Sequence, residues 1–400
     1  MAIHSRCVGR IKTAEPFAKK TIRSDAQRLH VLLIYRKMIS SIRLCGHCQM
    51  EYLAQKGKLE YRAIQDIKLR SSDLNWADIV LLGRLDSWYE YQLTKKLCEA
   101  GKYLIYIIDD DLLNVPPGIS SAAYYGQKKI QSYIRRMIEM SDAILSPSPL
   151  LLQKYAVHSR KAIQIEEPAI DPVSYKPHDP KMPVKIGFAG SIDRTGDVES
   201  ILKGAMLRIK REYGDRVAFE FYGAIPSFAG QLGARCISYC DSYDEYRRTL
   251  NSLEWDIGLA PMPDTPFHAC KHYNKFVEYA AAGAVGIYSN VMPYSRLQPL
   301  GQDLALLVGA EQDAWFKVLY ALINDRTELE RKRQLVIQYA VKEMNIAVTA
   351  DALIEQLYML QAERSMKEYP FGMMLKEKLY AVFERGYRAI NARVARLIAK

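Results

Sequence analysis

Short apolar segments alternate with amphipathic ones over the first part of the chain. These segments are apolar along almost their whole length, which is typical of strands covered on both faces of a parallel sheet. The predicted strands are residues 30–35, 61–67, 78–83, 103–108 and 143–145. Helices are predicted between them at residues 42–55, 87–100 and 124–140. The first part of the chain is therefore predicted to be a doubly wound α/β domain, residues 30–170.

A second α/β pattern begins after a proline-rich segment. Five prolines lie between residues 168 and 183, a density that predicts a linker at residues 171–183. Strands are then predicted at residues 184–189, 217–222, 256–260 and 284–289, and helices at 197–213, 244–250, 271–282 and 314–361. Residues 184–361 thus form a second Rossmann-like domain. Two such domains face each other across a cleft, and the ligand is expected at the carboxyl ends of their strands.

Composition places the chain among globular proteins. It has 400 residues, of which 49% are hydrophobic and 25% charged. No apolar run reaches the roughly 18 residues that a membrane span needs, and the N-terminus lacks the apolar region of a secretory signal. Seven scattered cysteines fit a reducing compartment better than a disulfide framework. A cytoplasmic location is therefore expected.

The net charge of +11 is concentrated at the two ends of the chain. Residues 1–30 and residues 361–400 each carry a net charge of +5, which leaves +1 for everything between them. A nucleic-acid enzyme more often spreads its charge over a groove in the body, so no nucleic-acid partner is expected. Basic ends, a predicted extension at residues 1–29 and a tail at residues 362–400, better suit the inner face of an anionic membrane. Solvated ends are the alternative.

The tail at residues 362–400 has an amphipathic pattern. Its apolar positions recur with helical spacing: Leu375, Leu379, Val382, Phe383, Ile390, Val394 and Leu397. Its basic residues Lys376, Lys378, Arg385, Arg388, Arg393 and Arg396 fall mostly on other parts of the helical wheel. Such a helix can lie in a membrane interface, which would bring the protein close to a lipid-linked molecule. The alternatives are that this helix packs on the body of the protein or forms a dimer contact.

Two strand–loop–helix segments contain candidate binding residues. Gly190, Ser191 and Arg194 follow the strand 184–189, and a helix with Asp197 as its candidate N-cap comes next. Backbone N–H groups at such a helix start suit a phosphate, and the guanidinium adds a charged fork. The same glycine-containing turn also occurs in α/β domains without a phosphate ligand.

The segment 256–289 is more specific. A buried strand leads into a loop rich in proline, and a predicted helix then carries Lys271, Lys275 and Glu278. The last two share a helix face and could be an ordinary surface ion pair. Near the carboxyl end of a strand, however, two lysines can neutralise a diphosphate, and a carboxylate can accept hydrogen bonds from a ribose diol.

These residues resemble a known family. The segment from Asp256 to Tyr279 is similar to the D-I-G-L-A-P-L-x-D-x-P-F-N-x-x-K-S-x-x-K-x-x-E-Y pattern of GT-B glycosyltransferases, group 1 or family 4-like, of the bacterial surface-polysaccharide type. The matching residues are Asp256–Pro261, Asp264, Pro266, Phe267, Lys271, Lys275, Glu278 and Tyr279. Gly101-Lys102, the D-D-D-L at residues 109–112, and residues 141–146 add support, and the resemblance covers about residues 30–355.

The resemblance implies a transferase that takes a nucleotide-diphosphate sugar as donor. The C-terminal domain would hold the donor, with Gly190, Ser191, Arg194, His268, Lys271, Lys275 and Glu278 as donor-binding residues. Glu278 would be the second glutamate of the family's E-x7-E motif, whereas Cys270 stands in place of the first. The family further implies retention of configuration, no metal and no cofactor, and a glycan or lipid-linked saccharide as acceptor. The missing glutamate leaves open a nucleotide-sugar or glycan-binding protein without turnover.

The acidic run at residues 109–111 has two functional interpretations. Asp109-x-Asp111 has the spacing of a D-x-D metal site, which would make the protein a metal-dependent transferase. In the GT-B interpretation the run follows a strand and faces the cleft, with Asp110, and Asp109 beside it, close to the donor sugar. Asp110, Asp109 and Lys271 are then the catalytic candidates. An acidic helix cap is the structural alternative.

Cys45-Gly46-His47-Cys48 has the spacing of a disulfide-exchange site. A zinc site that combines these cysteines with Cys236 and Cys240 is a weaker alternative. The preferred interpretation is a loop and helix start at the cleft, with Ser41 and Arg43 available to an acceptor.

Overall fold

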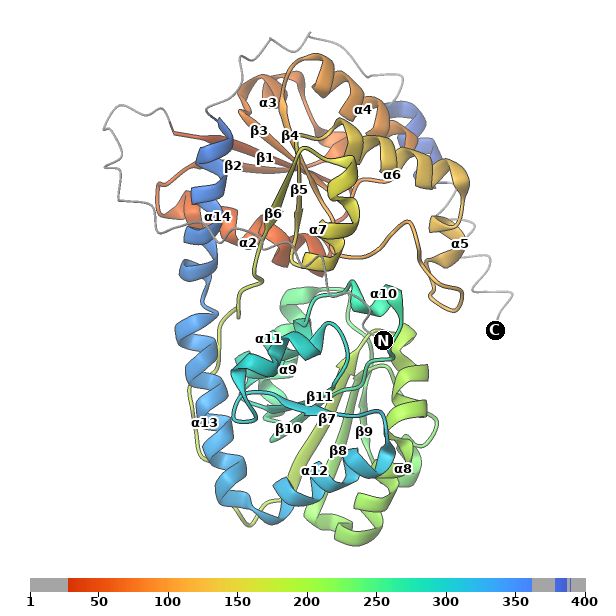
Figure 1. Cartoon of the computed structure of the whole chain (residues 1–400), viewed down its shortest axis with the longest axis vertical. Helices are drawn as coiled ribbons and strands as arrows, with labels where there is room; N and C mark the ends of the chain where they lie inside the picture. The colour runs from red at the N-terminus through yellow and green to blue at the C-terminus, as the bar shows by residue number, and fades with distance from the viewer. Residues whose placement is uncertain (1–27, 362–377, 387–388, 390–400) are drawn as a thin grey trace, which may run out of the picture.

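The computed structural model describes residues 28–361, 378–386 and 389, and it consists of two α/β domains stacked one above the other (Figure 1). Each domain is built on a six-stranded sheet whose strands are all parallel. The strand order is β2-β1-β3-β4-β5-β6 in the N-terminal sheet and β12-β11-β10-β7-β8-β9 in the C-terminal one. The prediction of two doubly wound domains is confirmed. The predicted extension at residues 1–29 and most of the tail lie outside the described residues.

The strands follow the apolar segments closely. The N-terminal strands are β1 (His30–Tyr35), β2 (Glu60–Gln65), β3 (Ile79–Gly83), β4 (Tyr103–Ile107), β5 (Ala143–Ser146) and β6 (Lys161–Gln164). The C-terminal strands are β7 (Val184–Gly190), β8 (Val217–Gly223), β9 (Arg235–Ile237), β10 (Ile257–Ala260), β11 (Val285–Ser289) and β12 (Leu306–Val308). The sequence did not predict β6, β9 and β12, which are short edge strands with exposed or half-buried positions.

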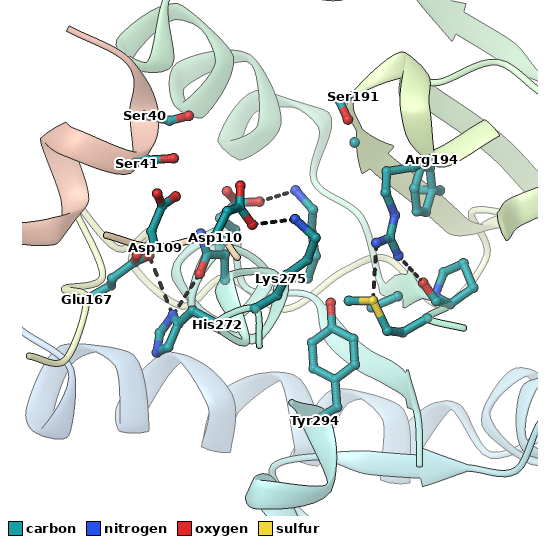
Figure 2. Close-up of a pocket in the computed structure, with 18 residues that line it drawn as sticks. Ser40, Ser41, Asp109, Asp110, Glu167, Ser191, Arg194, His272, Lys275 and Tyr294 are labelled. Carbon is teal, nitrogen blue, oxygen red and sulfur yellow. Dashed lines mark hydrogen bonds and ion pairs between the residues drawn. The ribbon is translucent and has the colours of Figure 1, made fainter. Parts of the chain in front are cut away.

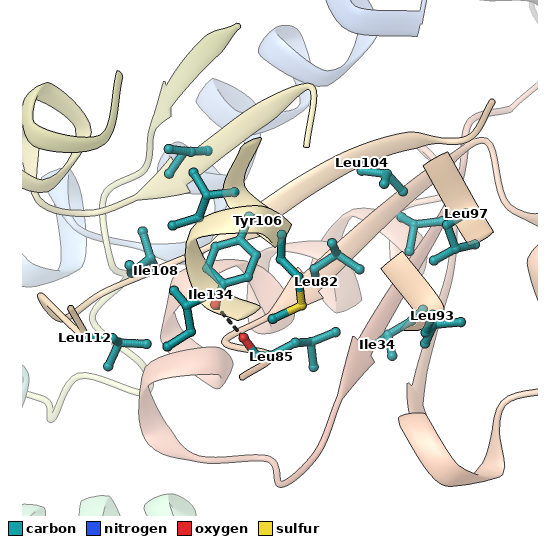
Figure 3. Packing of buried hydrophobic residues seen from close by; sticks show 14 of the residues in the cluster. Ile34, Leu82, Leu85, Leu93, Leu97, Leu104, Tyr106, Ile108, Leu112 and Ile134 are labelled. Atoms are coloured by element: carbon teal, nitrogen blue, oxygen red, sulfur yellow. Dashed lines mark hydrogen bonds between the residues drawn. The ribbon is translucent and has the colours of Figure 1, made fainter. Parts of the chain in front are cut away.

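Helices cover both faces of each sheet. In the N-terminal domain they are α1 (Ser40–Ile42), α2 (Cys48–Gln55), α3 (Ser71–Trp76), α4 (Trp88–Glu99), α5 (Ala122–Tyr125), α6 (Lys128–Met140) and α7 (Pro149–Tyr155). One face packs on α4 and α6 in a core where Leu82, Leu93 and Ile134 are fully buried (Figure 3). In that core the Tyr106 hydroxyl donates a hydrogen bond to the Leu85 carbonyl at 2.5 Å, so the phenol buries its ring without losing a partner.

The C-terminal domain has the same layered arrangement. Its helices are α8 (Thr195–Tyr213), α9 (Tyr243–Leu253), α10 (Pro266–Ala269), α11 (Asn274–Ala282), α12 (Gln312–Asn324) and α13 (Arg326–Glu343). Apolar residues of α8 and α12 cover one face of the sheet, and those of α9, α11 and α13 cover the other. The proline-rich segment at residues 171–183 connects the domains without helix or strand.

The last helices return the chain to the N-terminal domain. α14 (Ile346–Gln361) follows α13 along one side of the molecule (Figure 1), and its Leu353, Leu357 and Leu360 pack in the core of the N-terminal sheet. Residues 378–386 are also helical and lie on that domain, where Arg385 pairs with the buried Asp66. Both segments therefore belong structurally to the N-terminal half. No helix in the described ranges is long and apolar enough to cross a bilayer.

Candidate functional site

A cavity lies between the two domains, where the carboxyl ends of both sheets meet. Its lining comes from the loops after β1, β4, β7 and β10 and from the start of α11, which is the position expected for a doubly wound fold. Figure 2 shows Ser40 and Ser41 at one end of the cavity and Ser191 and Arg194 at the other. The lining residues are Ser40, Ser41, Asp109, Asp110, Glu167, Phe188, Gly190, Ser191, Arg194, Ala260, Pro261, Met262, Lys271, His272, Asn274, Lys275, Glu278 and Tyr294.

An ion-pair network joins the two domains across this cavity. Arg84 Nη1 lies 2.8 Å from Asp109 Oδ1 and 3.4 Å from Asp110 Oδ2. Lys271 Nζ, which comes from the C-terminal domain, lies 2.6 Å from Asp110 Oδ1. Arg84 directly follows β3 and has a positive φ of 50°, which is uncommon for a residue other than glycine. Arg84 was not predicted as a site residue, although a charged residue directly after an apolar strand was a usable signal.

The pKa values of the two aspartates of this network shift in opposite directions. Burial would raise the pKa of Asp110, but the Lys271 ammonium and the Arg84 guanidinium outweigh it and lower the pKa to about 2. Burial raises the pKa of Asp109, an effect that Arg84 only partly opposes. Asp110 is therefore an ionised carboxylate at neutral pH, held between two cations at the centre of the cleft.

Asp111 has a separate structural role. Its buried carboxylate accepts hydrogen bonds from Lys154, from the Tyr155 hydroxyl at 2.6 Å and from the Asn114 amide at 3.0 Å. Asp109 is engaged by Arg84 instead, and Asp111 is not among the residues that line the cavity. The two carboxylates of the D-x-D spacing therefore do not converge on one point. No group of three His, Cys, Asp or Glu side chains suited to a metal ion occurs within the described residues.

The predicted helix 271–282 is wrong in its first turn. The chain forms the short α10, then a turn that contains Lys271, and only at Asn274 does α11 begin. Lys275 and Glu278 share a face of α11 as expected, with Nζ and Oε2 2.5 Å apart. Tyr246 of α9 contacts both, because its hydroxyl lies 3.0 Å from Lys275 Nζ and donates to Glu278 Oε2 at 2.8 Å. Lys271 thus reaches the cavity from a different direction than Lys275.

The loop after β7 forms the far end of the cavity. Gly190 and Ser191 line it, and Arg194 precedes the first residue of α8. The Arg194 guanidinium donates to the Pro261 carbonyl at 2.5 Å and lies 2.9 Å from an Asp197 carboxylate oxygen. Asp197 is therefore in the first turn of α8 and is not its N-cap. The positive end of α8 and a fixed guanidinium meet here, which suits an anion.

A second, smaller cavity adjoins the first beside Lys275 and Glu278. Four tyrosines line it: Tyr222, Tyr239, Tyr243 and Tyr246. The rings of Tyr222 and Tyr246 lie 5.0 Å apart, and Tyr239 is half exposed. The cavity therefore combines aromatic faces with the carboxylate of Glu278, a composition suited to a planar ring attached to a polar sugar.

Two of the proposed contact residues, His268 and Arg43, lie outside the cavity lining, and so does Cys270. His268 is buried and contacts Thr265, and burial lowers the pKa of His268 to about 4, so it carries no charge at neutral pH. Arg43 pairs with Asp244 of α9 at 3.0 Å, across the domain interface. Cys270 packs in the apolar core of the N-terminal domain. It therefore points away from the cavity and offers no substitute for the missing glutamate.

The C-G-H-C segment does not have the features of a redox site. Cys45 and Cys48 are both buried, and burial raises the pKa of each thiol, whereas disulfide exchange needs a lowered one. Gly46, at a φ of 123°, interrupts the predicted helix 42–55. The Cys236 and Cys240 thiols contact backbone carbonyls, and no metal-binding group includes them in the described part of the chain.

Comparison with known proteins gives matches at the level of structure. No family model and no curated protein matches the sequence. Among solved structures, HepE of Anabaena in complex with UDP and glucose matches with a TM-score of 0.57 and 10% identity, covering 83% of this chain and 100% of that one. An alpha-glucosyltransferase in complex with UDP and DNA matches with a TM-score of 0.55, 10% identity, and coverage of 84% and 100%. A glycosyltransferase from Rickettsia africae matches with a TM-score of 0.54 and 12% identity, covering 85% of this chain and 100% of that one. The chain therefore has the GT-B fold that these glycosyltransferases share.

Proposed function

We propose that this protein is a glycosyltransferase that uses a nucleotide-diphosphate sugar. The observation that carries the proposal is the interdomain cavity, in which Lys271, Lys275, Arg194 and the start of α8 provide fixed positive charge beside Glu278. A diphosphate leaving group needs such charge, and a ribose diol needs an acceptor carboxylate. The neighbouring cavity, lined by four tyrosines, offers aromatic faces on which the base can stack.

We infer a reaction without a metal ion or other cofactor. The bond between the anomeric carbon and the diphosphate oxygen breaks, and its electron pair leaves on the nucleoside diphosphate. Lys271, Lys275 and Arg194 offset this developing charge. An acceptor hydroxyl then bonds to the same carbon, and its proton goes to the departing phosphate. This course retains the configuration and requires no protein nucleophile, with Asp110 placed beside the reacting sugar.

The first test is calorimetric titration of the whole chain with UDP, GDP, ADP, CMP and dTDP, each with EDTA and with Mn²⁺. UDP is the expected ligand, because HepE and the alpha-glucosyltransferase were both solved with UDP. Tight binding in EDTA followed by sugar transfer from the matching donor supports the proposal. Binding that requires Mn²⁺ contradicts the metal-free mechanism, binding without transfer indicates a non-catalytic sugar-binding protein, and no binding contradicts both.

We further propose that the protein works at the cytoplasmic face of an anionic membrane, on a glycan or lipid-linked saccharide in polysaccharide biosynthesis. Residues 378–386 are anchored to the N-terminal domain by Arg385 and by the buried Ala381. On the same helix Leu379, Val382 and Phe383 are more than half exposed. The following residues, 387–400, contain four basic residues and no acidic one. Exposed apolar groups beside positive charge suit an interfacial peripheral contact.

Replacing Leu379, Val382 and Phe383 together with serine should remove most binding to vesicles of anionic lipid, because the inserted apolar area is lost. Co-sedimentation with phosphatidylglycerol vesicles measures this effect. The control is the double variant Val341→Ser and Val348→Ser, at two similarly exposed valines of α13 and α14. This variant should leave vesicle binding unchanged. If the triple variant still sediments with vesicles, or if it instead converts a dimer to a monomer in light scattering, the membrane contact is wrong.

A further inference from the structure

Glu167 is a buried carboxylate whose role the donor site leaves unexplained. It follows β6, at the point where the chain leaves the N-terminal sheet, and its side chain is 1% exposed. It lines the cavity together with Ser40, Ser41 and Asp109. Figure 2 shows Glu167 and His272 together at the end of the cavity away from Arg194. The sequence gives no sign of this placement, because Glu167 lies near the end of the predicted N-terminal domain, far along the chain from the motif residues.

The charge of Glu167 is balanced, but its hydrogen-bonding capacity is not filled. Its Oε1 accepts a hydrogen bond from the Cys45 thiol at 3.2 Å. Its Oε2 lies 3.6 Å from His272 Nδ1 and has no hydrogen-bond partner among the described residues. His272 is itself buried, and although burial alone would lower its pKa, Glu167 and Glu166 raise it to about 9. An imidazolium therefore lies beside both carboxylates, and Glu167 Oε2 still has no hydrogen-bond partner among the described residues.

Such an oxygen favours a ligand that donates a hydrogen bond. Leaving a buried polar atom without a partner costs stability, and this buried oxygen belongs to a residue that lines the cavity. A second carboxylate, Asp109, lines the same end, so the local charge opposes a phosphate. Neutral hydroxyl groups are donors without that penalty. The seryl hydroxyls of Ser40 and Ser41 add groups that can both donate and accept.

We propose that Glu167 binds hydroxyl groups of a saccharide in the cleft, at the end opposite to the phosphate-binding residues. The inference rests on the proposed transferase function and names a contact within it. Two sources supply the same chemistry: the sugar of the donor and the sugar of the acceptor. Cys270 cannot make this contact, because its side chain packs in the N-terminal core.

The test uses the Glu167→Gln variant of the full chain, which preserves the shape of the side chain and removes its charge. Titrations with UDP, and with UDP-glucose, UDP-galactose and UDP-N-acetylglucosamine, measure the donor arm. Saturation-transfer NMR with methyl α-glucoside and methyl β-galactoside on the UDP-saturated protein measures the acceptor arm. Glu166→Gln is the matched control, since Glu166 also pairs with His272 but lies outside the cavity lining.

UDP affinity should be unchanged in Glu167→Gln, because the phosphate and ribose contacts are elsewhere. Loss of about 10- to 100-fold in affinity for the preferred UDP-sugar assigns Glu167 to the donor, the size expected for one hydrogen bond to a charged group. Loss of glycoside signal with unchanged UDP-sugar affinity assigns it to the acceptor. The proposal is overturned if Glu167→Gln changes neither UDP-sugar affinity nor the glycoside signal, or if Glu166→Gln causes equal losses. It is also overturned if the wild-type protein binds UDP but no sugar. Failure of the wild type to bind any nucleotide overturns the transferase function instead.

Removal of one member of a buried ion pair can also destabilise the fold. If Glu167→Gln melts before the titration temperature, Glu167→Asp keeps the charge and withdraws the carboxylate from the cavity by one methylene. Its saccharide affinity should fall while UDP affinity and the melting temperature stay close to those of the wild type. A folded Glu167→Asp protein with wild-type saccharide affinity overturns the proposal.

Discussion

Lys271→Met should lower kcat/KM by about 10²- to 10³-fold, the effect of removing one fixed group that stabilises developing charge. Lys271 Nζ is positioned by Asp110 at 2.6 Å and also lies 4.7 Å from the centre of the Phe267 ring. It is therefore held in place in the absence of a donor, and under the proposed mechanism its charge would act on the leaving phosphate without reorganisation. Methionine is an unbranched side chain only one atom shorter than lysine, so the loss reports mainly the charge. Steady-state kinetics with the donor identified by titration measure it.

Two further variants separate the charge of Lys271 from other effects. Lys271→Arg keeps a cation and should retain part of the activity. Lys203→Met removes an exposed lysine of α8 and should leave kcat/KM unchanged. Lys271 also joins the two domains through Asp110, so its loss could affect activity by disturbing the cleft. A fall in kcat with little change in donor KM is expected only if the charge acts in the transition state. Activity of Lys271→Met within threefold of the wild type would contradict this role.

The buried strands were predictable because burial on both faces leaves a continuous apolar run. β1 matches its predicted range, and β7 differs from its predicted range only at its last residue. The edge strands β6 and β9 lack that signal, since their outer positions face solvent and carry residues such as Lys161 and Arg235. Their pairing depends on a neighbouring strand that is distant in sequence, which a local pattern does not report.

The candidate site was predictable where its residues share one local element. Lys275 and Glu278 come together through helix geometry alone. Arg84 and Glu167 enter the site through the meeting of strand ends from different parts of the chain, and no spacing along the sequence encodes that meeting. The same reason explains Arg43, whose expected role at the acceptor depended on a loop that instead pairs with Asp244 of the other domain.

Cys270, which stands where the resemblance expects a glutamate, is buried away from the cavity. α10 ends at Ala269 and α11 begins only at Asn274, so the intervening turn sets the direction of each side chain. Lys271 points to Asp110 in the cavity, whereas Cys270 packs in the N-terminal core and is 6% exposed. Restoring a glutamate at position 270 is therefore expected to disturb the fold without restoring a sugar contact.

Cys270→Glu should lower the free energy of unfolding by about 3 kcal/mol at pH 7.5, since it buries a carboxylate without a free partner. Asp111 and Asp110 are the nearest acidic groups, and the nearby cations Lys154 and Lys271 are already paired with them. Affinity for the UDP-sugar should not increase. Urea denaturation followed by tryptophan fluorescence measures the stability, and Cys270→Gln is the control of equal size that carries no charge.

The pH dependence distinguishes a buried charge from simple overpacking. Burial raises the folded-state pKa of an introduced carboxyl above its unfolded value near 4.3. The charged form is then disfavoured only in the folded state, so the stability gap between Cys270→Glu and Cys270→Gln should be small below about pH 4 and grow as the pH rises through the raised pKa. A gap that is independent of pH would indicate overpacking. A Cys270→Glu protein as stable as the wild type, with tighter UDP-sugar binding, would show instead that position 270 can face the donor.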